Sequence, residues 1–465
     1  MHCFGSRHPG IVLIIKNILP MSNKFRLTLL LLFIGAIFIS AFIIVEPAKS
    51  DTKSESCCKN HQNQDQKPQG CVFKSVMGED SLDTDFIYPI PEKVQASLSE
   101  ALSWISKAQL RDGGWGAGSH SQQNEMNPQN VPSDPATTAM VLMALLRNNH
   151  TPISGTYSQN LNQGTQFLIL SVLKSDPKSN NITLLTGTQP QSKLGANIDV
   201  VLTAQYFSNL LDYLQHDPEQ KNKVQQCLDI CVKKIEQNQN QDGSFKDDGW
   251  AGVLQSSYAN NALESAEKKG AKVNTGVLVK SRDYQKSNFD TQTGNVKTEK
   301  GAGVMLYSVS STARGSAAET REVKDKVKKA KKEGALREND EISVENLKKI
   351  GYADDQAYKA VTAYQVNEAS KVQAVRDDVM SGFGNNGGEE FMSFLQTGEG
   401  LIIAKDQEWK LWYDKVSAKL LQIQNDNGSW NGHHCITSPV FCTATCLLIL
   451  SVGNDIASLQ KTTMP

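Results

Sequence analysis

The stretch QNDNGSW at residues 424–430 decides how this sequence is interpreted. A glutamine in the last turn of a helix can satisfy exposed backbone carbonyls. The Asn-Gly pair supplies the positive φ that a tight turn requires. A tryptophan placed directly after such a turn is a large apolar group that can fill the space between neighbouring helices. The stretch therefore predicts an elbow between two packed helices.

The same pattern occurs twice more in the chain. QLRDGGW covers residues 109–115, and QNQDGSF covers residues 239–245. Each copy follows a segment whose apolar residues have the spacing of an amphipathic helix. One helix pair buries only one of its faces, so several pairs must stack before a core closes. The repeated positions are Gln109, Gly113, Trp115, Gln239, Gly243, Phe245, Gln424, Gly428 and Trp430.

These three motifs resemble the glutamine-tryptophan repeat of the prenyltransferase and squalene-cyclase (terpenoid cyclase) superfamily. The resemblance covers scattered segments between about residues 98 and 450. It implies an all-α fold, an α/α toroid in which outer helices wrap a ring of inner helices. The segments that begin at Thr188 and Gly428 also resemble bacterial repeat proteins of this superfamily, and the resemblance brings no settled activity with it. A generic helical bundle with Asp-Gly turns is the competing interpretation.

Composition divides the chain into further segments. Residues 27–45 form an uncharged apolar run that nearly spans a hydrocarbon core of about 30 Å, and Lys16, Lys24 and Arg26 precede it. This excess of positive charge predicts that the N-terminus is cytoplasmic. We expect a cytoplasmic segment (1–26), a transmembrane anchor or signal helix (27–45), a flexible tether (46–90), the toroid (91–455) with a charged insertion near 310–345, and a C-terminal tail (456–465).

The anchor predicts a protein of the inner membrane whose main domain is extracytoplasmic, in the periplasm. A cleaved signal peptide is the alternative, because Met21 could be the start and Ala48-x-Ser50 fits a small-x-small cleavage site. The domain would then be secreted. The formal net charge of −1 over 465 residues gives no electrostatic reason to expect nucleic acid as a partner.

The strongest candidate for a site follows the third motif. It comprises His433, His434, Cys435 and Cys442. Imidazole and thiolate groups are good zinc ligands, so His433, His434 and Cys435 are candidate metal ligands and zinc is a candidate cofactor. Two other interpretations stay open. The segment can be a hydrogen-bonded loop at the mouth of the toroid, with Cys442 and Cys446 as small buried residues, or Cys435 and Cys442 can form a disulfide.

Two other chemistries that use an α/α toroid lack their residues here. Squalene-hopene-type cyclisation needs an Asp-x-Asp-Asp acid, whereas the Asp pairs at 247–248, 354–355 and 377–378 lack that pattern and are interpreted as helix caps or surface pairs. A polysaccharide lyase on an α/α toroid needs a basic residue to remove a proton and a cation beside the uronate. No Arg or Lys cluster lies near the motifs, so the lyase is the weaker alternative. Cys227 and Cys231, one helical turn apart, are expected to be core thiols.

Two functions from different classes remain. The first is a ligand-binding or scaffold module whose central cavity or mouth holds a hydrophobic small molecule or a peptide. The second is an enzyme of the prenyltransferase or cyclase-like class, metal-dependent if zinc is bound, with its site at residues 433–442. The sequence does not settle between them, and the binding module is our working hypothesis.

Overall fold

The computed structural model describes residues 88–245, 249–290, 292–380, 387–404 and 406–454. They belong to the unit Asp65–Pro465, the second of two units in the chain. The predictions for the anchor at 27–45, for nearly all of the tether and for the C-terminal tail concern residues outside this description. Among the described residues, no helix is both long enough and apolar enough to cross a membrane.

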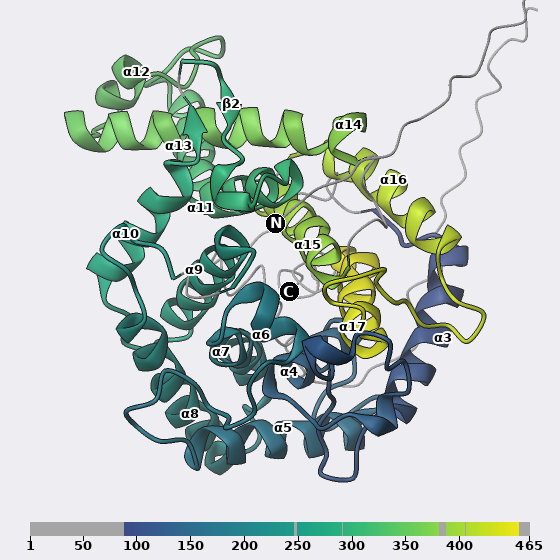
Figure 1. Ribbon diagram of the computed structural model, residues 1–465. Helices are drawn as coiled ribbons and strands as arrows, with labels where there is room; N and C mark the ends of the chain where they lie inside the picture. The colour runs from purple at the N-terminus through teal and green to yellow at the C-terminus, as the bar shows by residue number, and fades with distance from the viewer. Residues whose placement is uncertain (1–87, 246–248, 291, 381–386, 405, 455–465) are drawn as a thin grey trace, which may run out of the picture. The chain divides into compact units, whose positions relative to one another are not determined.

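An inner ring of helices lies at the centre of this unit (Figure 1). Helix α4 packs against α7 and α17, α9 packs against α7 and α11, and α15 packs against α11 and α17, so that the ring closes. The inner helices are α4 (Pro135–Arg147), α7 (Ile198–Leu210), α9 (Gly252–Lys268), α11 (Met305–Lys332), α15 (Gly388–Ile403) and α17 (Pro439–Leu450). The predicted α/α toroid is confirmed.

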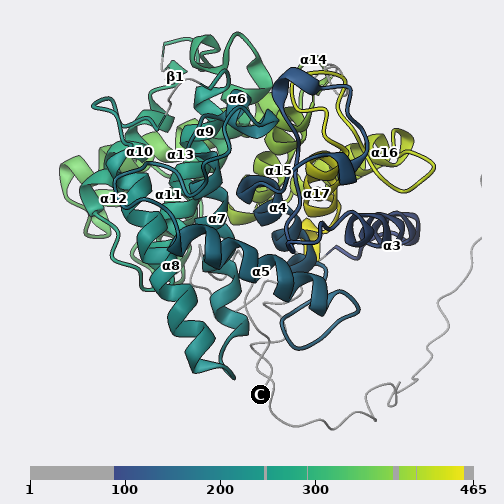
Figure 2. The same cartoon turned by 60° about the horizontal axis from the view of Figure 1, so that its bottom comes forward.

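Outer helices surround this ring, and each packs on one or two inner helices. In Figure 2 the outer helices α8, α5 and α3 lie along the near side, with α7, α4 and α17 behind them. The outer helices are α3 (Glu92–Lys107), α5 (Ser158–Leu173), α8 (Pro218–Gln237), α10 (Thr275–Lys286), α13 (Asp354–Ala374) and α16 (Trp409–Gln422).

Short elements connect the two layers. Strands β1 (Phe289–Asp290) and β2 (Asn295–Val296) form an antiparallel pair in which Phe289 lies opposite Val296. The remaining short elements are helices α6 (Gln189–Leu194), α12 (Val344–Lys349) and α14 (Asp377–Met380), and the 3-10 turns η2 (His120–Gln122), η3 (Pro128–Asn130), η4 (Leu211–Tyr213) and η5 (Glu299–Gly301).

The two layers differ in sequence because they differ in burial. Every residue of α4 and of α17 is buried, which suits helices that are apolar on all sides. Both begin with proline at the first turn, and the side chains of Asp134 and Ser438 accept hydrogen bonds from backbone amides of that turn. The outer helix α3 instead buries one stripe, which includes Val94, Leu98 and Ile105.

The motif glutamines connect each elbow to the next outer helix. The side-chain amide of Gln109 donates to the Gly113 carbonyl oxygen at 2.7 Å and to the Asn160 carbonyl oxygen of α5 at 2.9 Å. Gln239 does the same with Gly243 and with Val277 of α10, and Gln424 with Gly428 and with Ser97 of α3. The last of these contacts joins the end of the ring to its beginning.

The motif glycines allow a close approach that a side chain would prevent. Gly113, Gly243 and Gly428 have φ between +85° and +88°. A Cβ atom at Gly243 would lie 2.2 Å from the carbonyl oxygen of Lys280 in α10. Glycine therefore serves both the turn and the contact with the following outer helix.

The motif aromatics fill the space between the layers. Trp115, Phe245 and Trp430 are fully buried. The indole N–H of Trp115 donates to the Ile105 carbonyl oxygen at 2.8 Å, and that of Trp430 donates to the Leu420 carbonyl oxygen at 2.9 Å. In each tryptophan elbow the ring therefore bonds to the end of the preceding outer helix, as well as filling apolar space.

The charged insertion expected near 310–345 begins later than predicted. The residues from Leu306 to Ala317 are buried in the inner ring, as the first half of α11. The charged second half of α11 packs with α12 and α13 around a small separate core. The residues of that core are Val323, Val327, Ala330, Leu336, Leu347, Ala357 and Val361.

We expect Trp115→Ala to lower the free energy of unfolding by ~3–5 kcal/mol, because it leaves a cavity in a fully buried site. Chemical denaturation followed by circular dichroism measures this change. Leu184→Ala, at a fully exposed side chain, serves as the control and should leave stability unchanged. Equal stability of the two variants would show that the elbow does not hold the layers together.

Candidate functional site

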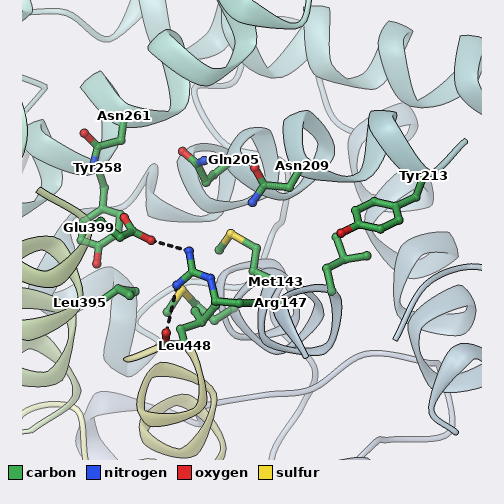
Figure 3. A pocket seen from close by; sticks show the side chains of 12 residues that line it. Met143, Arg147, Gln205, Asn209, Tyr213, Tyr258, Asn261, Leu395, Glu399 and Leu448 are labelled. Atoms are coloured by element: carbon green, nitrogen blue, oxygen red, sulfur yellow. Dashed lines mark hydrogen bonds and ion pairs between the residues drawn. The ribbon is translucent and has the colours of Figure 1, made fainter. Parts of the chain in front are cut away.

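The inner ring encloses a narrow pocket toward the C-terminal ends of its helices. The walls come from α4, α7, α9, α15 and α17, with Tyr213 added by η4 (Figure 3). The cavity is small: the space open to the centres of water-sized molecules is about 40 Å³. Its apolar lining consists of Met140, Met143, Leu146, Leu395 and Leu448.

A chain of buried ion pairs runs from this pocket into the wall of the ring. Arg147 of α4 donates from Nη2 to Oε1 of Glu399 at 2.7 Å, and from Nη1 to the Leu448 carbonyl oxygen at 3.0 Å (Figure 3). The other carboxylate oxygen of Glu399 lies 3.8 Å from Nε of Arg314 in α11. Nη1 of Arg314 in turn lies 3.5 Å from Oε2 of Glu264 in α9. These four charged groups therefore connect four helices of the inner ring.

The chain ends near the surface at Arg282 of α10, whose Nε lies 3.0 Å from Oε1 of Glu264. The side chain of Arg282 is 25% exposed, whereas those of Arg314 and Glu264 are 1% and 3% exposed. A buried charge without a partner would cost several kcal/mol. The alternation of guanidinium and carboxylate groups keeps each charge paired from the pocket outward.

The position of Arg147 also suits the helix that carries it. It is the last residue of α4, where the aligned peptide dipoles leave partial negative charge. The Leu448 carbonyl oxygen that it contacts lies in the last turn of α17, where carbonyls have no partner within the helix. Arg147 therefore caps two inner helices and contributes to the pocket wall.

Three carboxamides line the pocket beside this pair (Figure 3). Gln205 and Asn209 lie one turn apart on α7, and Asn261 lies on α9. The carbonyl oxygen of each of these side chains is buried and has no hydrogen-bond partner in the structure. The amide of Gln205 donates to the Ser265 hydroxyl at 2.9 Å. A buried acceptor without a donor costs about 1–3 kcal/mol, so these oxygens favour a ligand or water that donates.

Tyr258 presents its ring to the pocket because its hydroxyl is engaged elsewhere. That hydroxyl donates to the Met392 carbonyl oxygen at 3.0 Å. Burial and the negative charge of Glu399 raise the pKa of Tyr258 well above its usual value. The phenol therefore stays protonated at neutral pH and offers no base.

The site predicted from the sequence lies at the other end of the ring. The inner helices run in parallel, as contacts between their first turns show: Asp199 of α7 accepts from the Ala136 amide of α4, and Glu389 of α15 accepts from the Ile436 amide just before α17. Cys435 lies at this N-terminal end, while the central pocket lies toward the C-terminal ends. The structure does not bring the two together.

Cys435 is buried and held by side chains from distant segments. Its Sγ lies 2.8 Å from Nδ1 of His434, and its amide donates to the side-chain oxygen of Gln123 at 2.8 Å. Its φ of +69° places a non-glycine residue in the left-handed region, where strain of about 1–3 kcal/mol is stored. Burial and the nearby carboxylate of Glu389 raise the pKa of the Cys435 thiol to about 11, although Lys193 opposes this shift.

The other three residues of the predicted site do not form a cluster with Cys435 that could bind a metal ion. His433 and His434 are exposed. Cys442 is buried in α17, and its Sγ lies 3.5 Å from the Ile436 carbonyl oxygen. Cys435 and Cys442 are free thiols, so the disulfide alternative is not present in this structure. Burial and Glu389 raise the pKa of the Cys442 thiol well above its usual value.

The arrangement does not fit a zinc site. In the described part of the chain, no three His, Cys, Asp or Glu side chains are grouped as a metal ion would require. Zinc binding by His433, His434 and Cys435 therefore stays a prediction without support from the geometry.

The remaining predictions about single residues are in part tested by the structure. Cys227 and Cys231 are buried in α8, which confirms that they are core thiols. The pairs at 354–355 and 377–378 are exposed and begin α13 and α14, as expected of helix caps or surface pairs. The pair at 247–248 lies outside the described residues.

Buried carboxyls elsewhere in the ring also have structural partners. Asp134 caps the start of α4 and accepts from the amides of Thr137 and Ala117 at 2.7 Å and 2.8 Å. Burial and the neighbouring Asp199 raise the pKa of Asp134 to about 7. Both oxygens of Asp199 also accept hydrogen bonds, from the Ala136 amide and the Gln191 side chain. These two residues join the starts of α4 and α7.

No pattern in the sequence predicts the polar residues of the central pocket. Arg147 and Glu399 are separated by 252 positions, so no local pattern pairs them. A weak signal was available, because Arg314 stands in a run of small residues and Glu399 stands beside the apolar end of α15. Charged residues within otherwise buried helices predict an internal partner, without indicating which one.

We expect Glu399→Gln to lower the free energy of unfolding by ~3–5 kcal/mol at pH 7, because Arg147 and Arg314 both lose a buried counter-charge. Urea denaturation of the full chain measures this loss. Glu345→Gln removes the same charge from an exposed pair with Lys349, and its stability should stay close to that of the wild type. A Glu399→Gln protein as stable as this control would contradict a structural role for the ion-pair chain.

Comparison with known proteins supports the fold. The family model described as the squalene-hopene cyclase C-terminal domain matches residues 60–188, which contain the first elbow. No curated protein matches the chain.

Solved structures of one enzyme also match. The type II terpene cyclase MstE from Scytonema, in its apo form, is 14% identical, with a TM-score of 0.41, and the match covers 78% of this chain and 98% of the enzyme. A variant of the same enzyme in complex with geranylgeranyl dihydroxybenzoate is 12% identical, with a TM-score of 0.37 and the same coverage. At this level of sequence identity and TM-score, the similarity to the enzyme gives no argument about the activity or the substrate of this chain. The family model and the closed ring of paired helices support a place for this chain in a prenyltransferase and squalene-cyclase-like superfamily.

Proposed function

We propose that this toroid is a binding module that holds a small molecule in its central pocket. The observation that carries the proposal is the set of buried carboxamide oxygens of Gln205, Asn209 and Asn261, which face the pocket without donors. An apolar wall that includes Met143 and Leu395 lies beside them. Pockets that bind small molecules combine an apolar lining with a few convergent polar groups in this way.

The same pocket is poorly equipped for polyene cyclisation. Such a reaction needs a carboxylic acid that protonates an alkene and aromatic faces that hold the resulting cations. The one acidic residue of the lining, Glu399, is engaged by guanidinium groups on both oxygens. Tyr213 and Tyr258 are the aromatic members of the lining. A binding role therefore fits the pocket better than this chemistry.

The location of the module is part of the proposal. The apolar run at 27–45 and the basic residues before it support an inner-membrane anchor and an extracytoplasmic toroid. This part rests on the sequence alone.

We expect native mass spectrometry of the purified full chain to show a bound small molecule that leaves on denaturation. Leu395→Phe should remove it, because the larger side chain at this 3% exposed position fills the pocket. Leu173→Phe, at a position 41% exposed on α5, is the matched control and should retain the molecule. Circular dichroism would confirm that both variants fold. Wild-type protein without a bound molecule, or equal retention by both variants, would contradict the proposal.

An enzyme that uses Cys435 is the second candidate, because His434 lies 2.8 Å from its Sγ. A nucleophilic cysteine needs thiolate character near neutral pH, whereas burial raises the pKa of this thiol to about 11. We expect the rate of Cys435 alkylation by iodoacetamide, measured by peptide mass spectrometry, to rise steadily with pH toward that value. A rate that is already at its plateau at pH 7, and is lost in His434→Ala, would instead favour the enzyme.

A further inference from the structure

The charges at the central pocket balance one another. Arg147 and Glu399 are the charged members of its lining, and Arg314 and Glu264 lie behind them. The four side chains are between 1% and 12% exposed. Two guanidinium groups therefore face two carboxylates inside the ring. A ligand with a net charge would enter without a counter-charge, which is unfavourable in a site removed from water.

The groups that lack partners are neutral. Gln205 is 8% exposed and Asn261 is 3% exposed, and each lines the pocket with an unpartnered carboxamide oxygen. Asn209 adds a third such oxygen one turn from Gln205. A carboxamide carries both an acceptor and two donors. Its complement is a neutral group that can donate and accept, such as a hydroxyl or an amide.

The apolar groups of the lining set a second requirement. Met140, Met143, Leu395 and Leu448 lie around the carboxamides, and the Tyr258 ring adds an apolar face, since its hydroxyl is bonded to Met392. A ligand that is polar throughout would lose hydration against these side chains without a replacement. The ligand must therefore combine hydrogen-bonding groups with a compact apolar frame.

We infer that the ligand of the central pocket is a neutral molecule with two or more hydroxyl or amide groups on a small apolar frame, and that organic acids and amines are excluded. This inference rests on the proposed binding function. It differs from that function in specifying the charge and the hydrogen-bonding groups of the ligand.

Three small probes of matched size test the inference on the full chain: propane-1,2-diol, propanoate and propylammonium. At equal ionic strength, we expect the diol alone to raise the Tm in a saturable way. Asn261→Leu should weaken diol binding by about tenfold or more, which corresponds to the loss of one hydrogen bond of ~1.4 kcal/mol. The same change should leave the Tm without probe equal to or above the wild-type value, because it removes a buried carboxamide oxygen that has no hydrogen-bond partner.

Asn339→Leu, at an exposed position in the connection between α11 and α12, is the matched control and should bind the diol as the wild type does. Saturable binding of the carboxylate or the ammonium probe that Leu395→Phe abolishes would overturn the inference and leave the binding function standing. A co-purifying molecule identified as an acid or an amine would do the same. If no probe binds and no molecule co-purifies, the binding function fails together with the inference.

Discussion

The bond from a glutamine side chain to the next outer helix is the interaction on which this ring depends. Apolar packing alone lets one helix pair slide along its neighbour. A directional contact, such as a hydrogen bond, is needed to fix the position of one pair against the next. Gln109, Gln239 and Gln424 each bond the carbonyl oxygen of their own turn and a carbonyl oxygen of the following outer helix. Each elbow is thereby placed against the pair that follows, and the pairs curve into a closed circle.

Half of the ring is built in another way. No glutamine motif stands between α5 and α7, between α10 and α11 or between α13 and α15. At the last two of these elbows, α11 and α15 are joined to each other and to α9 through Arg314, Glu399 and Glu264. Ion pairs of this kind contribute little net stability compared with apolar contacts, but breaking one is costly. These ion pairs therefore specify which helices pack together. The central pocket lies at the end of the ion-pair chain, where Glu399 pairs with Arg147.

The sequence predicted the architecture much better than the pocket. The elbows could be predicted because turn residues, glutamine and aromatic lie within seven positions of each other. The histidines and cysteines of the segment 433–442 led to the prediction of a site there. In the structure, Cys435 is a buried thiol that contacts Gln123 and Glu389. These two residues are far from Cys435 in the sequence, so no local pattern connects them to it. The pocket residues are single polar positions on different helices, and only the closed ring makes them neighbours.

The contact of Gln424 with Ser97 joins positions 327 residues apart. Loops of that size close slowly, since the entropy of the intervening chain must be lost before the contact forms. The pairs near the N-terminus can stack as they leave the ribosome, whereas α3 keeps an uncovered flank until α16 and α17 have been synthesised. The apolar stripe of α3 that these helices cover is therefore exposed for most of translation, and exposed apolar surface of this kind favours association between incomplete chains.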